Sequence, residues 1–411
     1  MSDPQRRVTY GELFAVREFR VLAGMTVLGA LATTAEILGL SVLVYARTGS
    51  PLLSAIAFGI GFLPQLVGGA LLTSLADRVS PRTLLVALLV VRALPGAAIG
   101  LLAMPVAAML ALVAVAASLD PVASASTGGL LPELLGPERY VLGRSVMHVA
   151  ATVAQILGLA VGGVVLAILT PQRLLLVAAA FLVAESLAIC RGLGHHPPRT
   201  TGERGGALKT TLAGNRALLS DRRIRGLLLA QWLTTWLVTG AESLLVSYVG
   251  ALGRPAGQVT VLLVALPIGM IAGDVIVGRL CQPSTQQRLS MPLATLMGLP
   301  LIAFAAHVPV PAGAGLLVLT AAGFGYQLPL QRRFVAALPT ELNGQSFGLL
   351  SAGMMGGQGL GPIAAGAVAA LAGPGAAIAA AGGACILTAV ALHQTLSGGQ
   401  HHSSKAVRAG P

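Results

Sequence analysis

Residues 62–85 read FLPQLVGGALLTSLADRVSPRTLL, and this stretch decides the fold class. An apolar run ends abruptly at Asp77 and Arg78, and a second apolar run begins just after Pro81 and Arg82. The charged turn between the two runs is too short to be a domain. A helix of about 20 apolar residues crosses the hydrocarbon core of a bilayer. The stretch therefore predicts two membrane-spanning helices joined by a tight, charged turn.

The composition of the whole chain favours the same class. Of the 411 residues, 55% are hydrophobic and only 10% are charged, whereas soluble domains carry roughly 25% charged residues. Apolar runs of spanning length recur from end to end, so we expect an all-α integral membrane protein in a lipid bilayer. Its twelve predicted spans cover residues 20–46, 52–75, 83–104, 106–128, 141–168, 173–191, 226–249, 258–280, 289–306, 312–330, 345–371 and 374–395.

The basic residues predict the orientation of the chain. The net charge of +12 could suggest a nucleic-acid partner, but the basic residues form no single patch, and we expect none. With the N-terminus inside, only Arg47, Arg173 and Arg254 of the 26 Lys and Arg residues lie outside, and Arg92 lies within a helix. Because basic residues favour cytoplasmic loops, we expect a plasma-membrane protein with both termini in the cytoplasm.

Sequence motifs for enzymatic or metal chemistry are missing from the chain. Cys190, Cys281 and Cys385 are isolated and form no CxxC pair, so we expect neither a metal site nor a disulfide framework. No Walker sequence and no nucleophile elbow occurs. We therefore expect no enzymatic activity and no cofactor, and an ATP-driven pump has no support in the sequence.

The two halves of the chain are related to each other. VREFRVL at 16–22 recurs as RRIRGLL at 222–228, and Gln155 with its following glycines recurs as Gln358. Parallel repeats of this kind are typical of one large class of transporters. The expected organisation is an N-terminal six-helix bundle at 1–191, a basic cytoplasmic linker at 192–225, a C-terminal six-helix bundle at 226–396 and a disordered tail at 397–411.

The charged turn resembles the signature that the major facilitator superfamily carries between its second and third helices, Gly-x-Leu-Ala-Asp-Arg-x-Gly-Arg-(Arg/Lys)-x-x-Leu. The chain departs from the signature at three positions. The two glycines are replaced by Thr73 and Ser80, and the first basic residue is replaced by Pro81. The resemblance implies the major facilitator fold, with twelve helices in two pseudo-symmetric six-helix bundles. It also implies a cytoplasmic gate, and the alternative is a surface turn whose charges only fix the topology. The gate is expected to consist of Asp77, Arg78 and Arg82. The residues that match the signature are Leu75, Ala76, Asp77, Arg78, Arg82, Leu84 and Leu85.

Within that superfamily the chain looks like the drug and metabolite exporters. The segment with Gly158, Gly162 and Gly163 is similar to their antiporter signature Gly-Pro-x-x-Gly-Gly, with Leu159 in the place of Pro. The resemblance implies that these glycines bend the helix and pack closely where the two halves meet. The alternative is generic packing of small residues. The second half carries a related segment with Gly361, Pro362 and Gly366.

Glu36 and Glu242 are the strongest candidates for chemistry inside the membrane. They lie near the middle of their predicted helices, at matching positions of the two repeats. A charged side chain at a helix centre costs about 2.5–3.5 kcal/mol on insertion scales. Burial favours the protonated carboxyl group, and water entering an opened cavity favours loss of the proton. The pair predicts proton coupling to alternating access, and the alternative is two carboxylates that only attract a cationic substrate.

Arg92 and Asp120 are expected to form a second charged group. The third and fourth predicted helices form an antiparallel hairpin, which places the two residues at similar depth. Their interaction is either a structural ion pair or part of a transport site in which Arg92 reads an anionic substrate. For Glu185 and Asp274, which lie nearer the cytoplasm, both a functional role and solvation at the inner face remain open.

The resemblance implies that helix 10 lines a central cavity, which adds Tyr326 and Gln327 to the expected substrate site. The combined prediction is a monomeric, proton-coupled exporter of small amphipathic drugs or secondary metabolites that works by alternating access. One alternative is an importer or facilitator of a small, possibly anionic nutrient. The other is a sensor of the same fold that transports nothing and binds a partner through residues 192–225.

Overall fold

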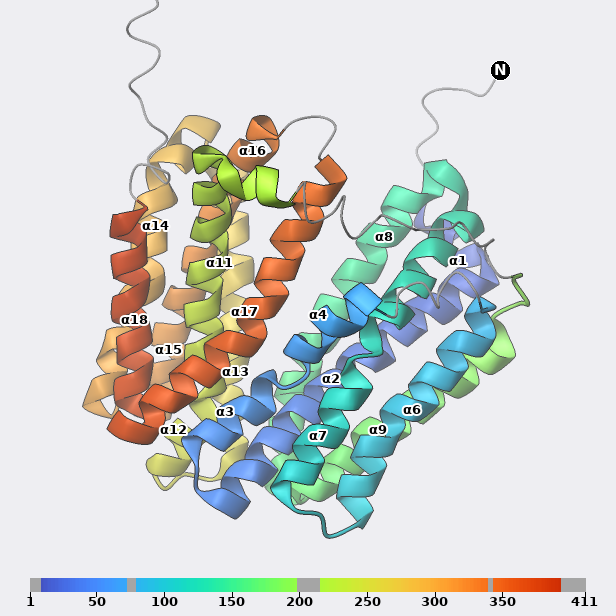
Figure 1. Cartoon of the computed structure of the whole chain (residues 1–411), viewed down its shortest axis with the longest axis horizontal. Coiled ribbons are helices and arrows are strands. Elements are labelled where there is room, and N and C mark those ends of the chain that lie inside the picture. Colours follow the sequence, from blue (N-terminus) through green and yellow to red (C-terminus); the bar gives the residue numbers. More distant parts are fainter. Residues whose placement is uncertain (1–8, 72–78, 198–214, 339–342, 393–411) are drawn as a thin grey trace, which may run out of the picture. The chain divides into compact units, whose positions relative to one another are not determined.

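The computed structural model describes residues 9–71, 79–197, 215–338 and 343–392. Within these ranges the chain is built of helices and turns and contains no strand (Figure 1). Eleven helices in these ranges are long and apolar enough to cross a membrane. The prediction of an all-helical membrane protein is confirmed.

The expected seventh span, 226–249, differs from the others. The structure divides it into α11 (Arg222–Ser243) and α12 (Leu245–Ala251). With 22 residues, α11 is long enough to span a bilayer. It also carries polar residues such as Gln231, Thr234 and Glu242, which make it less apolar than the eleven helices above. A polar helix of spanning length requires neighbours that satisfy its side chains.

The chain forms two compact units. Unit 1 consists of residues 1–47 and 60–203, and unit 2 of residues 48–59 and 204–411. The predicted second span, 52–75, is therefore divided between the units, because its helix breaks at Ile60 and Gly61 into α3 (Pro51–Gly59) and α4 (Phe62–Leu71). The linker predicted at 192–225 includes a short helical stretch at 215–220.

The described residues of unit 1 contain seven helices. A glycine in the left-handed region, Gly136 with φ 68°, separates the two halves of its longest helix, a conformation that side chains with a Cβ rarely adopt. The expected spans 106–128 and 141–168 lie on either side of this residue. The helices are α1 (Tyr10–Ala15), α2 (Arg17–Thr48), α4, α6 (Pro81–Leu101), α7 (Val106–Ala117), α8 (Asp120–Ile168) and α9 (Pro171–Gly192).

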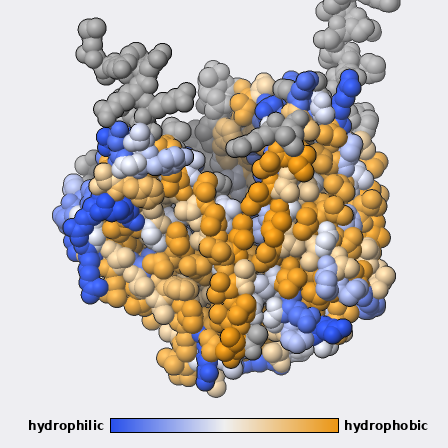
Figure 2. Space-filling view, turned by 180° about the vertical axis from the view of Figure 1, so that it is seen from behind, coloured by the Kyte–Doolittle hydropathy of each residue, from blue (hydrophilic) through white to orange (hydrophobic). Residues whose placement is uncertain are grey.

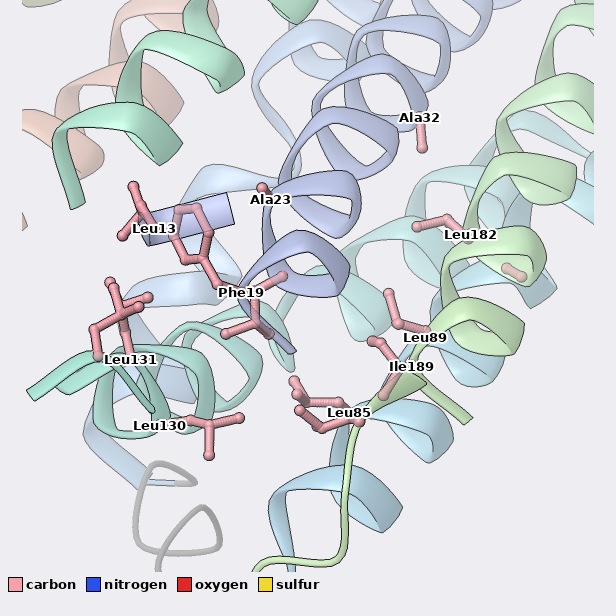
Figure 3. Packing of buried hydrophobic residues seen from close by; sticks show 14 of the residues in the cluster. Leu13, Phe19, Ala23, Ala32, Leu85, Leu89, Leu130, Leu131, Leu182 and Ile189 are labelled. Carbon is pink, nitrogen blue, oxygen red and sulfur yellow. The ribbon is translucent and has the colours of Figure 1, made fainter. Parts of the chain in front are cut away.

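The core of unit 1 joins its helices near the start of α2. Leu85 and Leu89 of α6 lie beside Ile189 of α9, while Leu13 of α1 and Phe19 of α2 lie near the first half of α8 (Figure 3). These side chains are at most 4% exposed. Fully burying a leucine, isoleucine or phenylalanine side chain contributes about 1.5–3 kcal/mol, so this cluster holds the five helices together.

Unit 2 is built around α11 and α17. The segment α3 packs against α17, where Gly366 lies against Leu52 and Ala55, and Gly59 lies against Pro362. The helices of this unit are α3, α11, α12, α13 (Val259–Val275) with a π-helical end (Ile276–Leu280), α14 (Pro283–Ile302), α15 (Val310–Ala322), α16 (Gln327–Ala337), α17 (Asn343–Ala372) and α18 (Pro374–Ala391).

The surface of the protein is that of a chain solvated by lipid. Hydrophobic residues cover much of the middle of one face, and many of the hydrophilic ones gather towards its edges (Figure 2). Large apolar side chains such as Leu371, Ile168 and Leu101 are more than 70% exposed. Such exposure on this scale is unfavourable in water and favourable in a bilayer.

Candidate functional site

A cavity of about 690 Å³ lies inside unit 1. Small-molecule sites commonly have volumes of about 300–1,000 Å³, so the cavity can hold a drug-sized ligand. Apolar residues such as Met25, Leu88 and Leu131 form part of its wall. Its polar lining residues come from α2, α4, α6, α8 and α9 and are Thr26, Thr33, Gln65, Arg92, Asp120, Ser124, Thr127, Tyr140, Arg144 and Glu185.

Arg92 of α6 is the central charge of this cavity. Its Nε lies 3.1 Å from Oδ1 of Asp120, and its Nη2 donates to Oε2 of Glu36 at 3.4 Å. Nη2 also approaches the hydroxyl oxygen of Thr33 at 3.5 Å. The side chains of Arg92, Glu36 and Asp120 are all less than a fifth exposed. The structure thus brings together three residues that the sequence analysis singled out, and it joins Glu36 to the expected Arg92–Asp120 pair.

Asp120 owes its position to a break in the fourth span. The helix α7 ends at Ala117, and α8 begins at Asp120, so this residue is the first of a new helix. Gln65 of α4 donates from Nε2 to Oδ2 of Asp120 at 3.2 Å. The backbone of α4 can come this close because Gly68 lies against the carbonyl group of Ser118, where a Cβ would collide. Sequence reasoning did not identify Gln65 as a site residue.

Glu185 of α9 lies on the wall of the same cavity. It is only 2% exposed, and within the described residues its Oε2 has no hydrogen-bond partner. The side chain of Glu185 therefore does not reach solvent at the inner face, which was one of its two expected environments. Asp274 of α13 is different, because it is exposed.

The buried charges around Arg92 do not balance. Glu36 and Asp120 contact Arg92, and Glu185 lies on the cavity wall near it, so three carboxylic acids accompany one buried cation. Arg144, the other arginine of the cavity wall, is exposed. Ions in a low-dielectric interior need partners, and an uncompensated one is strongly destabilising. The arrangement can therefore take up protons or a cationic ligand, and it can exchange one for the other.

The expected site residues of unit 2 are not gathered in the same way. Glu242 lies near the end of α11, and its side chain has no hydrogen bond or ion pair with the described residues. Tyr326 is fully buried in the core of unit 2 and donates its hydroxyl to the carbonyl oxygen of Ala230 at 2.8 Å. Because its hydroxyl is satisfied, the ring of Tyr326 packs in the core of this unit, and its role in a substrate site stays a prediction. Gln327 donates to Thr235 at 3.4 Å.

The glycines of the antiporter-like segment pack within unit 1. Gly158 of α8 lies against Leu31 and Thr34 of α2, and Gly162 lies against Leu38 one turn further along. Contact with α2 inside one unit is the packing alternative of the sequence analysis, since small residues let two helix backbones approach. Gly163 is buried in the same helix.

In unit 2, two glycines of α17 that precede the related segment lie against the tryptophans of α11. The indole of Trp232 lies against Gly353 of α17, and that of Trp236 lies against Gly357. One turn later Gly361 meets the backbone of α11 at Trp236. The two indole nitrogens donate to the carbonyl oxygens of Leu350 and Gly353 at 3.0 and 2.9 Å. Both tryptophans are therefore packing residues, and Pro362 and Gly366 receive α3 further along the same helix.

The expected cytoplasmic gate falls mostly outside the described residues. Asp77 and Arg78 belong to the segment 72–78, which the structure does not describe. Arg82, in the first turn of α6, donates to the carbonyl oxygen of Cys190 near the end of α9. This contact joins the start of α6 to the end of α9 within unit 1.

The sequence of the chain matches that of a known family. The profile of the Major Facilitator Superfamily matches residues 19–349. The chain belongs to the major facilitator superfamily. It is accordingly a secondary transporter and a multi-pass membrane protein that binds small-molecule substrates, and it is not an enzyme. No curated protein sequence matches the chain.

Solved structures of major facilitator transporters share the fold of this chain. The nucleoside transporter NupG matches with a TM-score of 0.73 at 13% identity, over 92% of this chain and 98% of that chain. The peptide transporter POT in complex with sulfate matches with 0.71 at 13% identity, over 95% and 96%. The human organic anion transporter MFSD10 (TETRAN) matches with 0.59 at 21% identity, over 92% and 99%. At these identities the likeness concerns the fold alone.

Proposed function

We propose that this major facilitator protein exports small amphipathic organic cations, such as drugs or secondary metabolites, in exchange for protons. The observation that carries the proposal is the excess of buried carboxylic acids around Arg92 in unit 1. Glu36 and Asp120 contact Arg92, and Glu185 lies on the wall of the same cavity. Arg144, the other arginine of that wall, is exposed. A carboxylate excess in a low-dielectric site attracts protons and cations and repels anions. The apolar part of the wall suits the apolar body of such a compound.

Alternating access supplies the coupling in this proposal. When the cavity is closed to water, the charge of an excess carboxylate must be compensated, either by a bound proton or by a bound cation. When the cavity opens, water and ions stabilise the free carboxylate, and the bound proton or cation leaves. In the proposal, protons enter from outside and the organic cation leaves the cytoplasm. The protein acts as a monomer in the plasma membrane with cytoplasmic termini.

Glu242 completes the proposal as the second candidate for proton coupling, since it occupies the matching position of the second repeat. The test uses inverted membrane vesicles with an acidic interior. Ethidium should accumulate in vesicles with the wild-type protein and should fail to accumulate when Glu36 and Glu242 are both replaced by Gln. Full accumulation by the double variant would contradict the role of these two carboxylates.

A second function is favoured by one observation. Arg92 lies on the cavity wall, and a guanidinium group can hold a carboxylate or a phosphate. The transporter would then import or facilitate a small anionic nutrient. Intact cells would accumulate that nutrient, and Arg92→Ala would abolish the accumulation, whereas the proposed exporter would lower the cellular content of cations.

A further inference from the structure

Glu185 differs from the other carboxylates of the cavity in its partners. Glu36 and Asp120 each contact Arg92, and Asp120 also accepts from Gln65. The Oε2 of Glu185 is buried and receives no hydrogen bond from the described residues. A buried charge without a partner is strongly unfavourable. Of the three carboxylic acids, Glu185 is therefore the one that most needs a proton or a cation.

The charged groups around Glu185 cannot supply that cation. Glu185 interacts electrostatically with Arg92 of α6 and with Asp120 at the start of α8. Arg92 already pairs with Asp120 and with Glu36 of α2. Arg144 of α8 lines the same cavity but is exposed. The charge of an ionised Glu185 would remain uncompensated in the empty cavity.

The carboxylate of Glu185 lies beside a glycine of α2. Gly29 of α2 faces it, and a Cβ at this position would lie 3.4 Å from Oε2 and 3.6 Å from Oε1. These distances are ordinary van der Waals contacts, so a methyl group would fit without a collision. The methyl group would fill the space that remains between α2 and the carboxylate, where Oε2 is already buried.

We propose that Glu185 is the group that exchanges a proton for the positive charge of the substrate, an amphipathic organic cation held in the cavity of unit 1. This assignment rests on the proposed function and adds to it a residue on α9. In the empty protein Glu185 carries a proton. Binding of the cation releases that proton, and the cation then lies against the carboxylate with its apolar groups on Met25, Leu88 and Leu131.

The first test is chemical labelling of the purified protein with dicyclohexylcarbodiimide. A protonated carboxyl group adds across one C=N bond of this reagent. The carboxyl oxygen bonds to the central carbon, the acid proton moves to nitrogen, and the adduct rearranges to a stable N-acylurea. Mass spectrometry should locate the adduct at Glu185 at neutral pH, and excess tetraphenylphosphonium should suppress it. An adduct distribution that omits Glu185 would overturn the assignment.

The second test compares two probe ions of nearly the same size and opposite charge. Tetraphenylphosphonium should bind the detergent-solubilised protein about tenfold or more tightly than tetraphenylborate, after subtraction of binding to empty micelles. Each bound cation should release close to one proton into a weakly buffered solution. Glu185→Gln should lose the proton release and about tenfold in affinity. Unchanged affinity and proton release in this variant would overturn the proposal.

A matched pair of glycine variants keeps the test independent of whether Glu185→Gln folds. Gly29→Ala places a methyl group on the carboxylate and should weaken cation binding, whereas Gly24→Ala, on the same helix with open space around it, should bind like the wild type. Equal binding by both variants would contradict the assignment. If the wild type binds neither ion but still accumulates ethidium in vesicles, the Glu185 assignment fails and the exporter proposal stands.

Discussion

Arg92 and Asp120 form an ion pair of 3.1 Å at the point where the chain starts a new helix. The carboxylate belongs to the first residue of α8, where the unpaired N–H groups of the first helical turn favour negative charge. Asp120 is therefore stabilised from two sides, by the guanidinium group and by the helix end. A helix break in the middle of a membrane span supplies this second contribution, which a continuous helix would lack.

The first prediction concerns the charge balance around Arg92. Arg92→Ala leaves Glu36 and Asp120 without their cation, and removing one partner of a buried ion pair costs about 3–5 kcal/mol. We expect a large fall in the thermal midpoint of the detergent-solubilised protein. Replacing the two carboxylates as well, in Arg92→Ala/Glu36→Gln/Asp120→Asn, should recover much of the loss because no unpaired ion remains.

The matched control for this prediction is Arg173→Ala. Arg173 is exposed in the first turn of α9, and exposed charges contribute about 0–1 kcal/mol. Its thermal midpoint should stay close to that of the wild type. A triple variant that is no more stable than Arg92→Ala would show that packing of the arginine side chain, and not its charge, is what unit 1 requires.

The second prediction concerns the contact between α11 and α17. Gly357→Ala would place a methyl group inside the space of the Trp236 ring, and overpacking costs typically about 1–3 kcal/mol. Gly348→Ala, on the same helix with open space around it, should keep or slightly raise stability because Ala favours a helix. Thermal unfolding followed by tryptophan fluorescence measures both variants, since the two tryptophans of the chain lie at this contact. Equal midpoints would refute the packing role of Gly357.

The third prediction concerns the link between the start of α2 and the chain after α9. Oε1 of Glu18 accepts from the backbone N–H of Gly194 at 2.6 Å and lies 3.2 Å from Nε2 of His196. Arg17 donates to the carbonyl oxygen of Arg191 at 3.3 Å. Glu18→Ala should free this segment and raise the rate of tryptic cleavage after Arg191 several-fold.

Limited proteolysis with mass spectrometry of the fragments checks the third prediction. Ser145→Ala, at an exposed position of α8, serves as the control and should be cleaved at the wild-type rate. An unchanged rate in Glu18→Ala would mean that the helix end of α9 is protected without the Glu18 contacts.

The sequence predicts a contact between two side chains well when their depth in the membrane decides whether they meet. Arg92 and Asp120 could be paired because an antiparallel hairpin puts them at the same depth, and the structure places them in contact. Depth does not reveal which way a helix face turns. For that reason neither the contact of Glu36 with Arg92 nor the packing of Tyr326 in the core of unit 2 was predicted.

Local breaks in the helices also escaped sequence reasoning. The predicted second span, 52–75, is interrupted at Ile60 and Gly61, and the fourth is interrupted just before Asp120. Both segments are predominantly apolar, and hydropathy averages over such breaks. Gln65 was missed for the same reason, since only the approach of α4 to the break at Ser118 brings its amide to Asp120. The sequence did contain one signal for Gln65, because it is a polar residue beside Pro64 inside an apolar run.

The last prediction tests whether Gln65 and Asp120 act as a unit. Gln65→Glu puts a second carboxylate beside Asp120, and like charges at this distance repel each other. Asp120→Asn removes the partner of Arg92. In the double variant the carboxylate and the amide exchange places, so one carboxylate and one amide again face each other near Arg92. We expect the double variant to be more stable than the sum of the single losses implies, with a coupling of about 0.5–3 kcal/mol.

Chemical or thermal unfolding of the wild type, both single variants and the double variant gives this coupling directly. Strict additivity would show that the 3.2 Å contact between Gln65 and Asp120 contributes nothing of its own to the stability of unit 1.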